Sequence, residues 1–288
     1  MTTRSFFKFD KTSISAYWNQ RVVYFSGNRD MSGGLPGITE LISRISGAFE
    51  NERWSAPIST DINVSRVNAD RSHDQLLSVS PSAAHKLYSE GFSLCFGDLS
   101  SEINSVKELK GLVAPIFDHE DLIKITAYLS PPSAVGVLHY DRQHNYFIQR
   151  EGSKRWYVSE RPAIVNPHEN LVYPRVNADF LREMNDRGYN ILLPKECGQS
   201  VFELHPGDIL YVPPGHYHSP ETMARPSLHY TLTLEPACFW KDLQKALYLE
   251  LLNRNEDLFK DYRFLASEQK NILVEKCRRH IFDLLQRS

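Results

Sequence analysis

Cysteine pairs, long apolar runs and an excess of one charge are all missing from this sequence. Its four cysteines, Cys95, Cys197, Cys238 and Cys277, are far apart and form no CxxC pair, so we expect neither a disulfide framework nor a zinc knuckle. No segment approaches the roughly 18 apolar residues of a membrane span, and the first residues lack the apolar core of a signal peptide. We therefore expect a cytoplasmic protein that does not contact membranes.

The balance of charges excludes a further class of partner. The 33 basic and 35 acidic side chains give a formal net charge of -2, which provides no overall attraction to nucleic acid. The basic cluster EKCRRH at 275–280 is more typical of a solvated helix face. With 41% hydrophobic and 24% charged residues among 288, the composition is that of a globular protein large enough to bury a substantial core.

The first of three regions, residues 1–115, mixes helical and strand patterns. Apolar spacing predicts helices at 38–49 and 80–91, and strands at 61–67 and 92–99. We expect this N-terminal α/β region to pack on the domain that follows.

Residues 116–236 are dominated by short strand signals. Aromatic and β-branched segments punctuated by Gly or Pro lie at 122–130, 145–152, 154–160, 200–207, 208–215 and 228–236. This pattern favours a mainly β fold with flanking helices, built on a double-stranded β-helix or jelly roll. A polar insertion at about 160–198 interrupts the strands. Its segment 161–180 has two equally good interpretations, a substrate-binding loop and a plain surface excursion.

Residues 237–288 turn helical. The segments 241–255 and 271–286 carry amphipathic periods without glycine or proline. They predict C-terminal helices and a candidate homodimer contact.

The stretch LHYDRQHN at 138–145 is the first that could carry chemistry. Side chains two apart on a strand project from the same face, so His139 and Asp141 point together while Tyr140 points away. An imidazole and a carboxylate aimed at one point supply two of the three ligands of a facial triad, which suits non-haem Fe(II). His144 points away from His139 and is expected to be a neighbour of the site rather than a ligand.

A third ligand is expected from GDILYVPPGHYH at 207–218. A Gly-Asp turn leads into a strand, a Pro-Pro-Gly turn leads out of it, and His218 starts the returning strand. This spacing is similar to the second signature motif of the cupin superfamily, in which the final His binds metal. The resemblance implies His218 as the ligand. His216 is the competing candidate, because the Pro-Gly turn makes strand alternation unreliable there.

Together the two motifs resemble those of the JmjC/cupin-type Fe(II)- and 2-oxoglutarate-dependent oxygenases. HYDRQHNYFIQREGSKRWYV followed by GDILYVPPGHYH is most similar to the bacterial cupin-like branch that includes the ribosomal oxygenases. The resemblance is close over 85–236, and ISAYWNQRVVYFSG near the N-terminus is also similar to that family. It implies an Fe(II) centre at His139, Asp141 and His218, with 2-oxoglutarate and O2 as co-substrates and no catalytic side chain beyond the metal site.

Lys154, fifteen positions after His139, strengthens the resemblance. In the family a Lys or Arg at this offset pairs with the distal carboxylate of 2-oxoglutarate. A buried dianion needs such a charge-assisted partner, because desolvation would otherwise oppose its binding. Arg155 is the neighbouring candidate, but it is expected on the other face of the strand.

The resemblance assigns five further residues to the co-substrate pocket. Asn145 matches a position that hydrogen-bonds near the 2-oxoglutarate carboxylate. Thr126 and Tyr128, on the preceding strand, are expected to offer hydroxyl groups. His229 and Thr231 lie on the strand after the second motif, where the family often carries Asn and Ser, so His229 departs from the usual pattern.

These features predict an oxygenase that hydroxylates a C–H bond of an amino-acid side chain, in a peptide, a protein or a small biosynthetic intermediate. N-methyl-lysine demethylation is an alternative, because it uses the same chemistry. Few residues follow the predicted barrel, which counts against the full C-terminal half of the ribosomal oxygenases. A cupin-fold metal- or ligand-binding module without turnover would be expected to lose a ligand. A cupin isomerase, or a dioxygenase independent of 2-oxoglutarate, would not need Lys154.

Overall fold

The computed structural model of the protein describes residues 10–27, 34–46, 61–68, 73–117, 122–173, 178–238, 244 and 266–285. The chain separates into two compact units, Met1–Pro236 and Ala237–Ser288. The first unit holds the strands and the candidate site residues, and the second contributes helix α8 (Ser267–Leu285). Among the residues described, no helix is long and apolar enough to cross a membrane.

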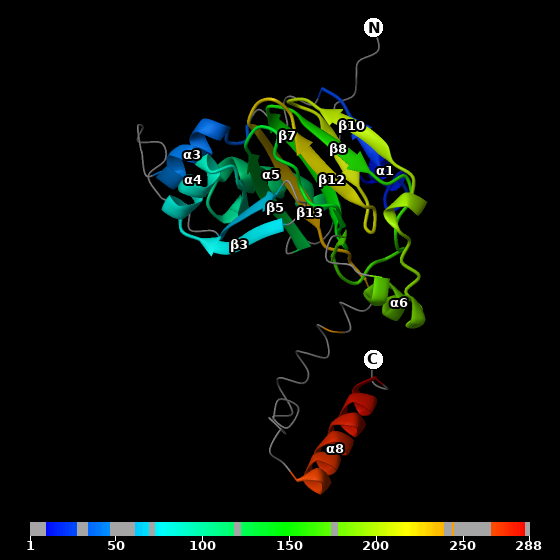
Figure 1. Ribbon diagram of the computed structural model, residues 1–288. Helices are drawn as coiled ribbons and strands as arrows, with labels where there is room; N and C mark the ends of the chain where they lie inside the picture. Colours follow the sequence, from blue (N-terminus) through cyan, green and yellow to red (C-terminus); the bar gives the residue numbers. More distant parts are fainter. Residues whose placement is uncertain are drawn as a thin grey trace. The chain divides into compact units, whose positions relative to one another are not determined.

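Two antiparallel sheets form the first unit (Figure 1). The larger has eight strands in the order β1-β11-β7-β13-β5-β4-β2-β3, and the smaller has five in the order β10-β8-β12-β6-β9. This arrangement confirms the predicted mainly β, jelly-roll fold. The strand bounds are β1 Val23–Phe25, β2 Ile62–Val67, β3 His73–Val79, β4 Ser93–Asp98, β5 Ile123–Ser130, β6 His139–Tyr140, β7 His144–Glu151, β8 Lys154–Val158, β9 Leu171–Val172, β10 Ser200–Leu204, β11 Ile209–Val212, β12 His218–Thr222 and β13 Ser227–Leu234.

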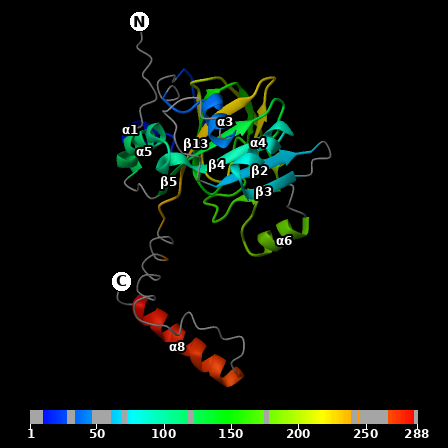
Figure 2. The same cartoon turned by 90° about the vertical axis from the view of Figure 1, so that its left-hand side faces the viewer.

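Helices α3, α4 and α5 cover one face of the eight-stranded sheet (Figure 2). Helix α4 begins where Ser80 Oγ accepts a hydrogen bond from the backbone N–H of Ala83, and Pro81 opens its first turn. The helical bounds in the first unit are α1 Lys11–Ser15, α3 Ile38–Ser46, α4 Pro81–Ser89, α5 Asn104–Phe117 and α6 Ala178–Asp186, with 3₁₀ turns η1 Leu99–Ser101 and η4 Pro194–Glu196.

Alternation along β5 separates the two faces of the large sheet. Ile125, Ala127 and Leu129 are fully buried in the main core, on the side of the helices. Thr126 and Tyr128 therefore point the other way, into the space between the two sheets. That space is where the candidate site lies.

A smaller core joins the two sheets beside that site. Phe147 of β7 stacks on Trp156 of β8 with 3.9 Å between ring centroids. The ring of His218 lies 5.5 Å from that of Phe147. Apolar rings therefore border the metal-binding candidates and limit the access of water.

The N-terminal region extends the large sheet. Strand β1 pairs with β11, and β4 pairs with β5, so the strands before residue 116 are continuous with those after it. The helices predicted at 38–49 and 80–91 correspond to α3 and α4, and the strands predicted at 61–67 and 92–99 to β2 and β4.

Four helices and strands of this region, α1, β1, β3 and α5, were not predicted from the sequence, and neither was the 3₁₀ turn η1. In the second unit, α8 occupies most of the helix predicted at 271–286. The helix predicted at 241–255 lies outside the described residues, apart from Gln244.

The insertion between β8 and β10 has a core of its own. It carries β9, α6 and η4. Its buried residues pack against Tyr140, which lies between His139 and Asp141, and against Tyr217, which directly precedes His218. This core consists of Tyr140, Ala163, Leu171, Met184, Ile191, Cys197 and Tyr217. A cavity of about 320 Å³ lies at its edge, with Leu138, Ser159 and Tyr217 in its lining.

Candidate metal centre

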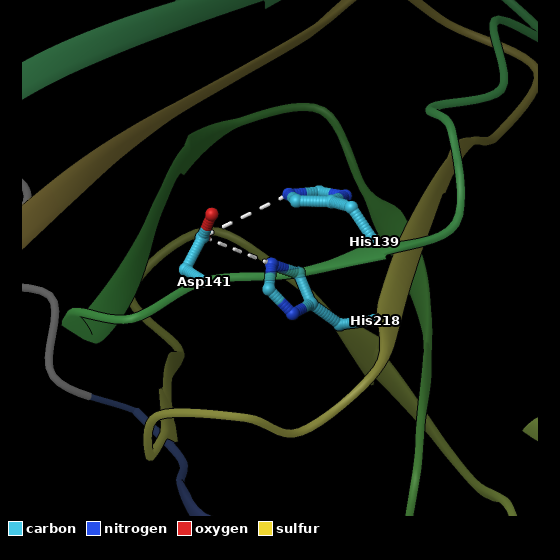
Figure 3. Close-up of side chains that lie close together, drawn as sticks. All are labelled: His139, Asp141 and His218. Carbon is cyan, nitrogen blue, oxygen red and sulfur yellow. Dashed lines mark ion pairs between the residues drawn. The ribbon is translucent and has the colours of Figure 1, made fainter. Parts of the chain in front are cut away.

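Three side chains converge on the inner face of the small sheet. His139 of β6 lies opposite His218 of β12 in the antiparallel ladder, and Asp141 follows β6 directly. One ligand atom from each of the three lies within 4.8 Å of the other two. Figure 3 shows the two imidazoles and the carboxylate pointing toward one another.

Backbone carbonyl groups fix the tautomers of both histidines. Nδ1 of His139 lies 2.9 Å from the oxygen of Val137, and Nδ1 of His218 lies 3.0 Å from the oxygen of His216. Each Nδ1 carries the proton that it donates, so each Nε2 keeps its lone pair for a metal. The Nε2 atoms of His139 and His218 lie 3.7 and 3.4 Å from Oδ2 of Asp141.

The charge of Asp141 also suits a ligand. Burial alone would raise its pKa, but the imidazoles of His139 and His218 and a hydrogen bond from Asn145 outweigh burial and lower the pKa to about 2. The carboxylate is therefore ionised at neutral pH, which is the state that metal binding requires.

Asn145 supports the Asp141 carboxylate. Its Nδ2 donates to Oδ2 of Asp141 at 2.7 Å, and its Oδ1 accepts from Oγ1 of Thr233 at 2.9 Å. The sequence resemblance had placed Asn145 beside the co-substrate carboxylate, whereas the described contact is with a candidate ligand. Thr233 was not predicted, although alternation with Thr231 on β13 would have put both on one face.

His216, the competing third ligand, lies outside the triad. Its Nδ1 faces the oxygen of Pro214 at 3.4 Å, and its buried Nε2 has no hydrogen-bond partner within the described part of the chain. Burial lowers its pKa, so the ring is neutral. The group of converging ligand atoms contains His218 and not His216.

His144 is buried on the face of β7 opposite to that of Asn145. Its ring stacks on Trp18 with 3.7 Å between centroids, and its Nδ1 lies 2.9 Å from the hydroxyl of Tyr211. Burial lowers its pKa to about 3, which keeps the imidazole neutral. His144 thus anchors the N-terminal segment to β7.

Lys154 projects from β8 into the space between the sheets. Its Nζ lies 3.1 Å from Oγ of Ser130 and 2.7 Å from Nδ1 of His229. Burial lowers its pKa from 10.5 to about 7. Arg155, the neighbouring candidate, points outward to the carboxylates of Glu203 and Glu221.

The turn before Lys154 requires glycine. Gly152 has a φ of +62°, and a Cβ built there would lie 2.1 Å from the carbonyl oxygen of Pro226. Only glycine meets both conditions, because the backbone is left-handed and the neighbouring atom is backbone. This turn sets the register in which β8 presents Lys154 to the interior.

The remaining predicted pocket residues occupy β5 and β13. The ring of Tyr128 stacks on that of His229, with 5.0 Å between centroids. Thr126 pairs with Thr231 across the two strands, and Oγ1 of Thr231 is buried with no hydrogen-bond partner in the described residues. Ser130 was missed, although the same alternation that selected Thr126 and Tyr128 extends to it.

The triad and the cluster of Lys154, Ser130 and His229 face the same space between the sheets. Together they fit Fe(II) with an anionic co-substrate. Two imidazoles whose Nε2 atoms face one ionised carboxylate are the donor set of a facial triad, which would leave coordination positions on the metal open. The ring of Trp156 lies 6.2 Å from that of His218 and 5.3 Å from that of His229, so it connects the triad with the Lys154 cluster. A bound anion could contact the metal at one end and a buried cation at the other.

Comparison with known proteins identifies relatives of this sequence. Residues 110–240 match the family described as JmjC domain. The "Bifunctional lysine-specific demethylase and histidyl-hydroxylase NO66" of Drosophila simulans is 28% identical over 181 residues, covering 62% of this chain and 19% of that protein. The "JmjC domain-containing protein D" of Dictyostelium discoideum is 33% identical over 113 residues, covering 37% of this chain and 24% of that protein. The chain thus spans about a fifth to a quarter of the length of these relatives.

Solved structures share the fold. The X-ray structure of E. coli ycfD matches with a TM-score of 0.55 and 18% identity, covering 94% of this chain and 66% of that one. The structure of YcfD described as a ribosomal oxygenase from Escherichia coli, in complex with cobalt and 2-oxoglutarate, matches with a TM-score of 0.55 and 17% identity. It covers 95% of this chain and 66% of that chain.

Proposed function

We propose that this chain is an Fe(II)- and 2-oxoglutarate-dependent oxygenase that hydroxylates a C–H bond, because residues 110–240 match the JmjC domain family and the fold is shared with solved oxygenase structures. The observation that carries the proposal is the pairing of a metal triad with a buried lysine in the same space between the sheets. His139, Asp141 and His218 supply the triad, and Lys154 the cation.

Each part of the site has a task in this reaction. His139, Asp141 and His218 would hold Fe(II), and Asn145 keeps the carboxylate oriented through its 2.7 Å hydrogen bond. Lys154 would take the distal carboxylate of 2-oxoglutarate in a charge-assisted hydrogen bond. When bound, Fe(II) and 2-oxoglutarate together supply the O2 chemistry that ends in succinate, CO2 and a hydroxylated product.

The substrate that we propose is an amino-acid side chain in a peptide, a protein or a small biosynthetic intermediate. A Drosophila relative is named for both histidyl hydroxylation and lysine-specific demethylation. Hydroxylation is the first candidate, and demethylation of an N-methyl-lysine is the second because that name includes it. Both start with oxidation of a C–H bond, so one site could perform either reaction.

Turnover of 2-oxoglutarate tests the proposal. The protein is mixed with Fe(II) and 2-oxoglutarate without O2, and succinate is quantified after O2 is admitted, with and without histidine-containing or methyl-lysine peptides. A peptide product heavier by one oxygen atom supports hydroxylation, and released formaldehyde supports demethylation. If 2-oxoglutarate neither binds nor yields succinate, even without a peptide, a module without turnover replaces the oxygenase proposal.

The choice of third ligand is tested on the metal itself. His218→Ala should lose Mn(II) binding measured by calorimetry, because its Nε2 faces Asp141 at 3.4 Å. His216→Ala should keep Mn(II) binding, because its ring lies outside the converging group. The reverse result would make His216 the ligand.

We further propose that the protein is cytoplasmic and forms a homodimer through α8. Ile272 and Phe282 on this helix are 64% and 60% exposed, and large exposed apolar side chains favour association. The four cysteines are free thiols, which suits a reducing compartment. Light scattering after size exclusion should give a dimer that Ile272→Glu with Phe282→Glu converts to a monomer. A monomeric wild type would contradict the dimer, and cell fractionation tests the location.

A further inference from the structure

Lys154 and His229 form a buried contact between two basic groups. Nζ of Lys154 lies 2.7 Å from Nδ1 of His229, and the two side chains are 2% and 3% exposed. Two cations at this separation would repel each other strongly in an enclosed space. The pair therefore holds at most one positive charge.

That charge, when present, belongs to Lys154. Burial and then the charge of Lys154 lower the pKa of His229 well below its ordinary value, so the imidazole is neutral. Nδ1 of His229 accepts a hydrogen bond from the ammonium group, which leaves the ring proton on Nε2. Ser130 Oγ takes a second N–H of the ammonium group at 3.1 Å. One of its three N–H donors remains for a ligand.

Two polar side chains on the neighbouring strands, Cys95 of β4 and Tyr128 of β5, are uncharged at neutral pH. The charged residues of these strands lie elsewhere: Asp98 pairs with Lys110, and Lys124 is exposed. Burial raises the pKa of the Cys95 thiol to about 11, and Tyr128 forms a hydrogen bond with that thiol. Cys95 and burial together raise the pKa of Tyr128 well above its ordinary value. The charge of Asp141 also acts on Tyr128, but that carboxylate is bonded to Asn145 and faces the two ligand histidines.

The other strands around the pair bring neutral side chains. Trp156 of β8 and Phe147 of β7 present their rings to His229, at 5.3 and 5.9 Å between centroids. The strand neighbours of Lys154 are Thr222 of β12 and Leu204 of β10. No carboxylate in the described chain forms an ion pair with Lys154, so a bound anion would be its first counter-charge.

We propose that His229 is a positioning residue for the co-substrate: it fixes Nζ of Lys154 so that the distal carboxylate of 2-oxoglutarate captures an ammonium group, with uptake of one proton from solvent. This inference rests on the proposed function and deepens it. The proton moves to Nζ of Lys154, and the carboxylate, ionised throughout, accepts the remaining N–H. No covalent bond forms or breaks at this step.

The proton count follows from the free state of Lys154. Its pKa of about 7 means that the amine predominates at pH 8.5 and the ammonium group at pH 6. Binding of a carboxylate stabilises the ammonium form, so close to one proton is taken up at pH 8.5 and nearly none at pH 6. Above pH 7 the affinity should fall about tenfold for each pH unit.

Calorimetry on the Mn(II)-loaded full chain measures this directly. 2-Oxoglutarate is titrated at pH 6 and pH 8.5 in buffers of different ionisation enthalpy, and the dependence of the heat on buffer gives the number of protons taken up. 2-Oxobutyrate, a 2-oxo acid without a distal carboxylate, is the control ligand, and its proton count is subtracted to remove events at the metal. The expected difference is about one proton at pH 8.5 and about zero at pH 6.

Substitutions at His229 separate positioning from packing. His229→Leu removes the acceptor at similar volume and should weaken 2-oxoglutarate at pH 6 about tenfold or more, leaving 2-oxobutyrate unaffected. His229→Asn places an amide oxygen near the position of Nδ1 and should recover most of the affinity.

Two further variants test the proton. Lys154→Arg stays charged at all these pH values and should bind with no proton uptake and a flat pH profile. Arg155→Gln, on the outer face of the same strand, is the matched control and should behave as wild type.

The outcomes separate the two claims. Equal proton counts for 2-oxoglutarate and 2-oxobutyrate at pH 8.5 would overturn the inference and leave the oxygenase proposal standing. Wild-type affinity in His229→Leu would do the same. If the Mn(II)-loaded protein binds no 2-oxoglutarate at pH 6 and none at pH 8.5, the result contradicts both the inference and the oxygenase proposal. If His229→Leu does not fold, the wild-type proton count and Lys154→Arg still decide the question.

Discussion

Replacing Lys154 with methionine should make the free protein more stable while abolishing co-substrate binding. Lys154 is a fully buried amine whose described contacts are neutral groups, Ser130 and His229. Methionine has a similar length and no charge. The substitution therefore removes the cost of burying a cation along with the group that would hold the dicarboxylate.

The magnitude follows from the pKa of Lys154. A pKa lowered from 10.5 to about 7 corresponds to a cost of about 5 kcal/mol when the group is charged, at about 1.4 kcal/mol per unit. Losing the hydrogen bonds to Ser130 and His229 offsets about 2–3 kcal/mol of this. At pH 6.5 the Lys154→Met protein should therefore be about 2 kcal/mol more stable than wild type.

The dependence on pH distinguishes this cause from a packing effect. Between the folded pKa of about 7 and the unfolded value of 10.5, the unfolded chain binds more protons at Lys154, so wild-type stability rises with pH in this window. From pH 6.5 to pH 9.5 wild type should gain about 3 kcal/mol relative to the variant. The advantage of methionine should disappear within that range.

Urea unfolding of the metal-free full chain at the two pH values measures the difference, in buffers free of dicarboxylates such as succinate. Lys124→Met, at an exposed position on β5, is the matched control and should show the same difference from wild type at both pH values. A Lys154→Met effect that does not change between pH 6.5 and pH 9.5 would refute the reasoning.

Two further predictions concern Asn145 and Gly215. Asn145→Leu removes the 2.7 Å hydrogen bond to the Asp141 carboxylate and should weaken Mn(II) binding by about 10- to 100-fold in calorimetry; unchanged affinity would mean that Asn145 does not orient the ligand. Gly215→Ala should lower the free energy of unfolding by about 3 kcal/mol, because Gly215 has a φ of +77° and a Cβ would lie 2.0 Å from the carbonyl oxygen of Ile164. Chemical denaturation at one pH measures this loss, and a wild-type midpoint would show that the insertion moves aside freely.

Local periodicity was sufficient for most strands and for two of the three residues of the triad. His139 and Asp141 could be paired because strand alternation acts over two residues and needs no tertiary information. The same rule could not choose between His216 and His218, because Gly215 adopts a left-handed conformation immediately before them and breaks the alternation. Motif spacing selected His218, and the backbone places its ring in the converging group.

The partner of Asn145 and the helix α5 lay beyond local patterns. Asn145 bridges Asp141 and Thr233, and Thr233 lies 88 residues away on a strand whose register sequence alone does not set. Helix α5 contains Gly111 and Pro115, which lower helix propensity. It forms because Val106, Leu109 and Val113 bury one stripe against the large sheet, and tertiary packing outweighs propensity.

Strand β3 was missed by the sequence prediction for a different reason. Leu76 and Leu77 are adjacent and are 48% and 67% exposed, so the segment shows no alternation between a buried and a solvated face. It is a strand because it pairs along the edge of β2. Periodicity cannot detect such an edge, since little of it is buried.

The pairing of β1 with β11 has a consequence for synthesis of the protein in a cell. Asn19, just before β1, donates its backbone N–H to the hydroxyl of Tyr211, 192 residues later in the chain. At about 5–20 residues per second, a ribosome needs roughly 10–40 s to deliver that partner. During this interval Tyr17 and Trp18 lack the ring of Tyr211, against which both pack in the folded protein. The nascent chain must be kept from aggregating until β11 emerges, so expression at low temperature or with added chaperones should raise the soluble yield.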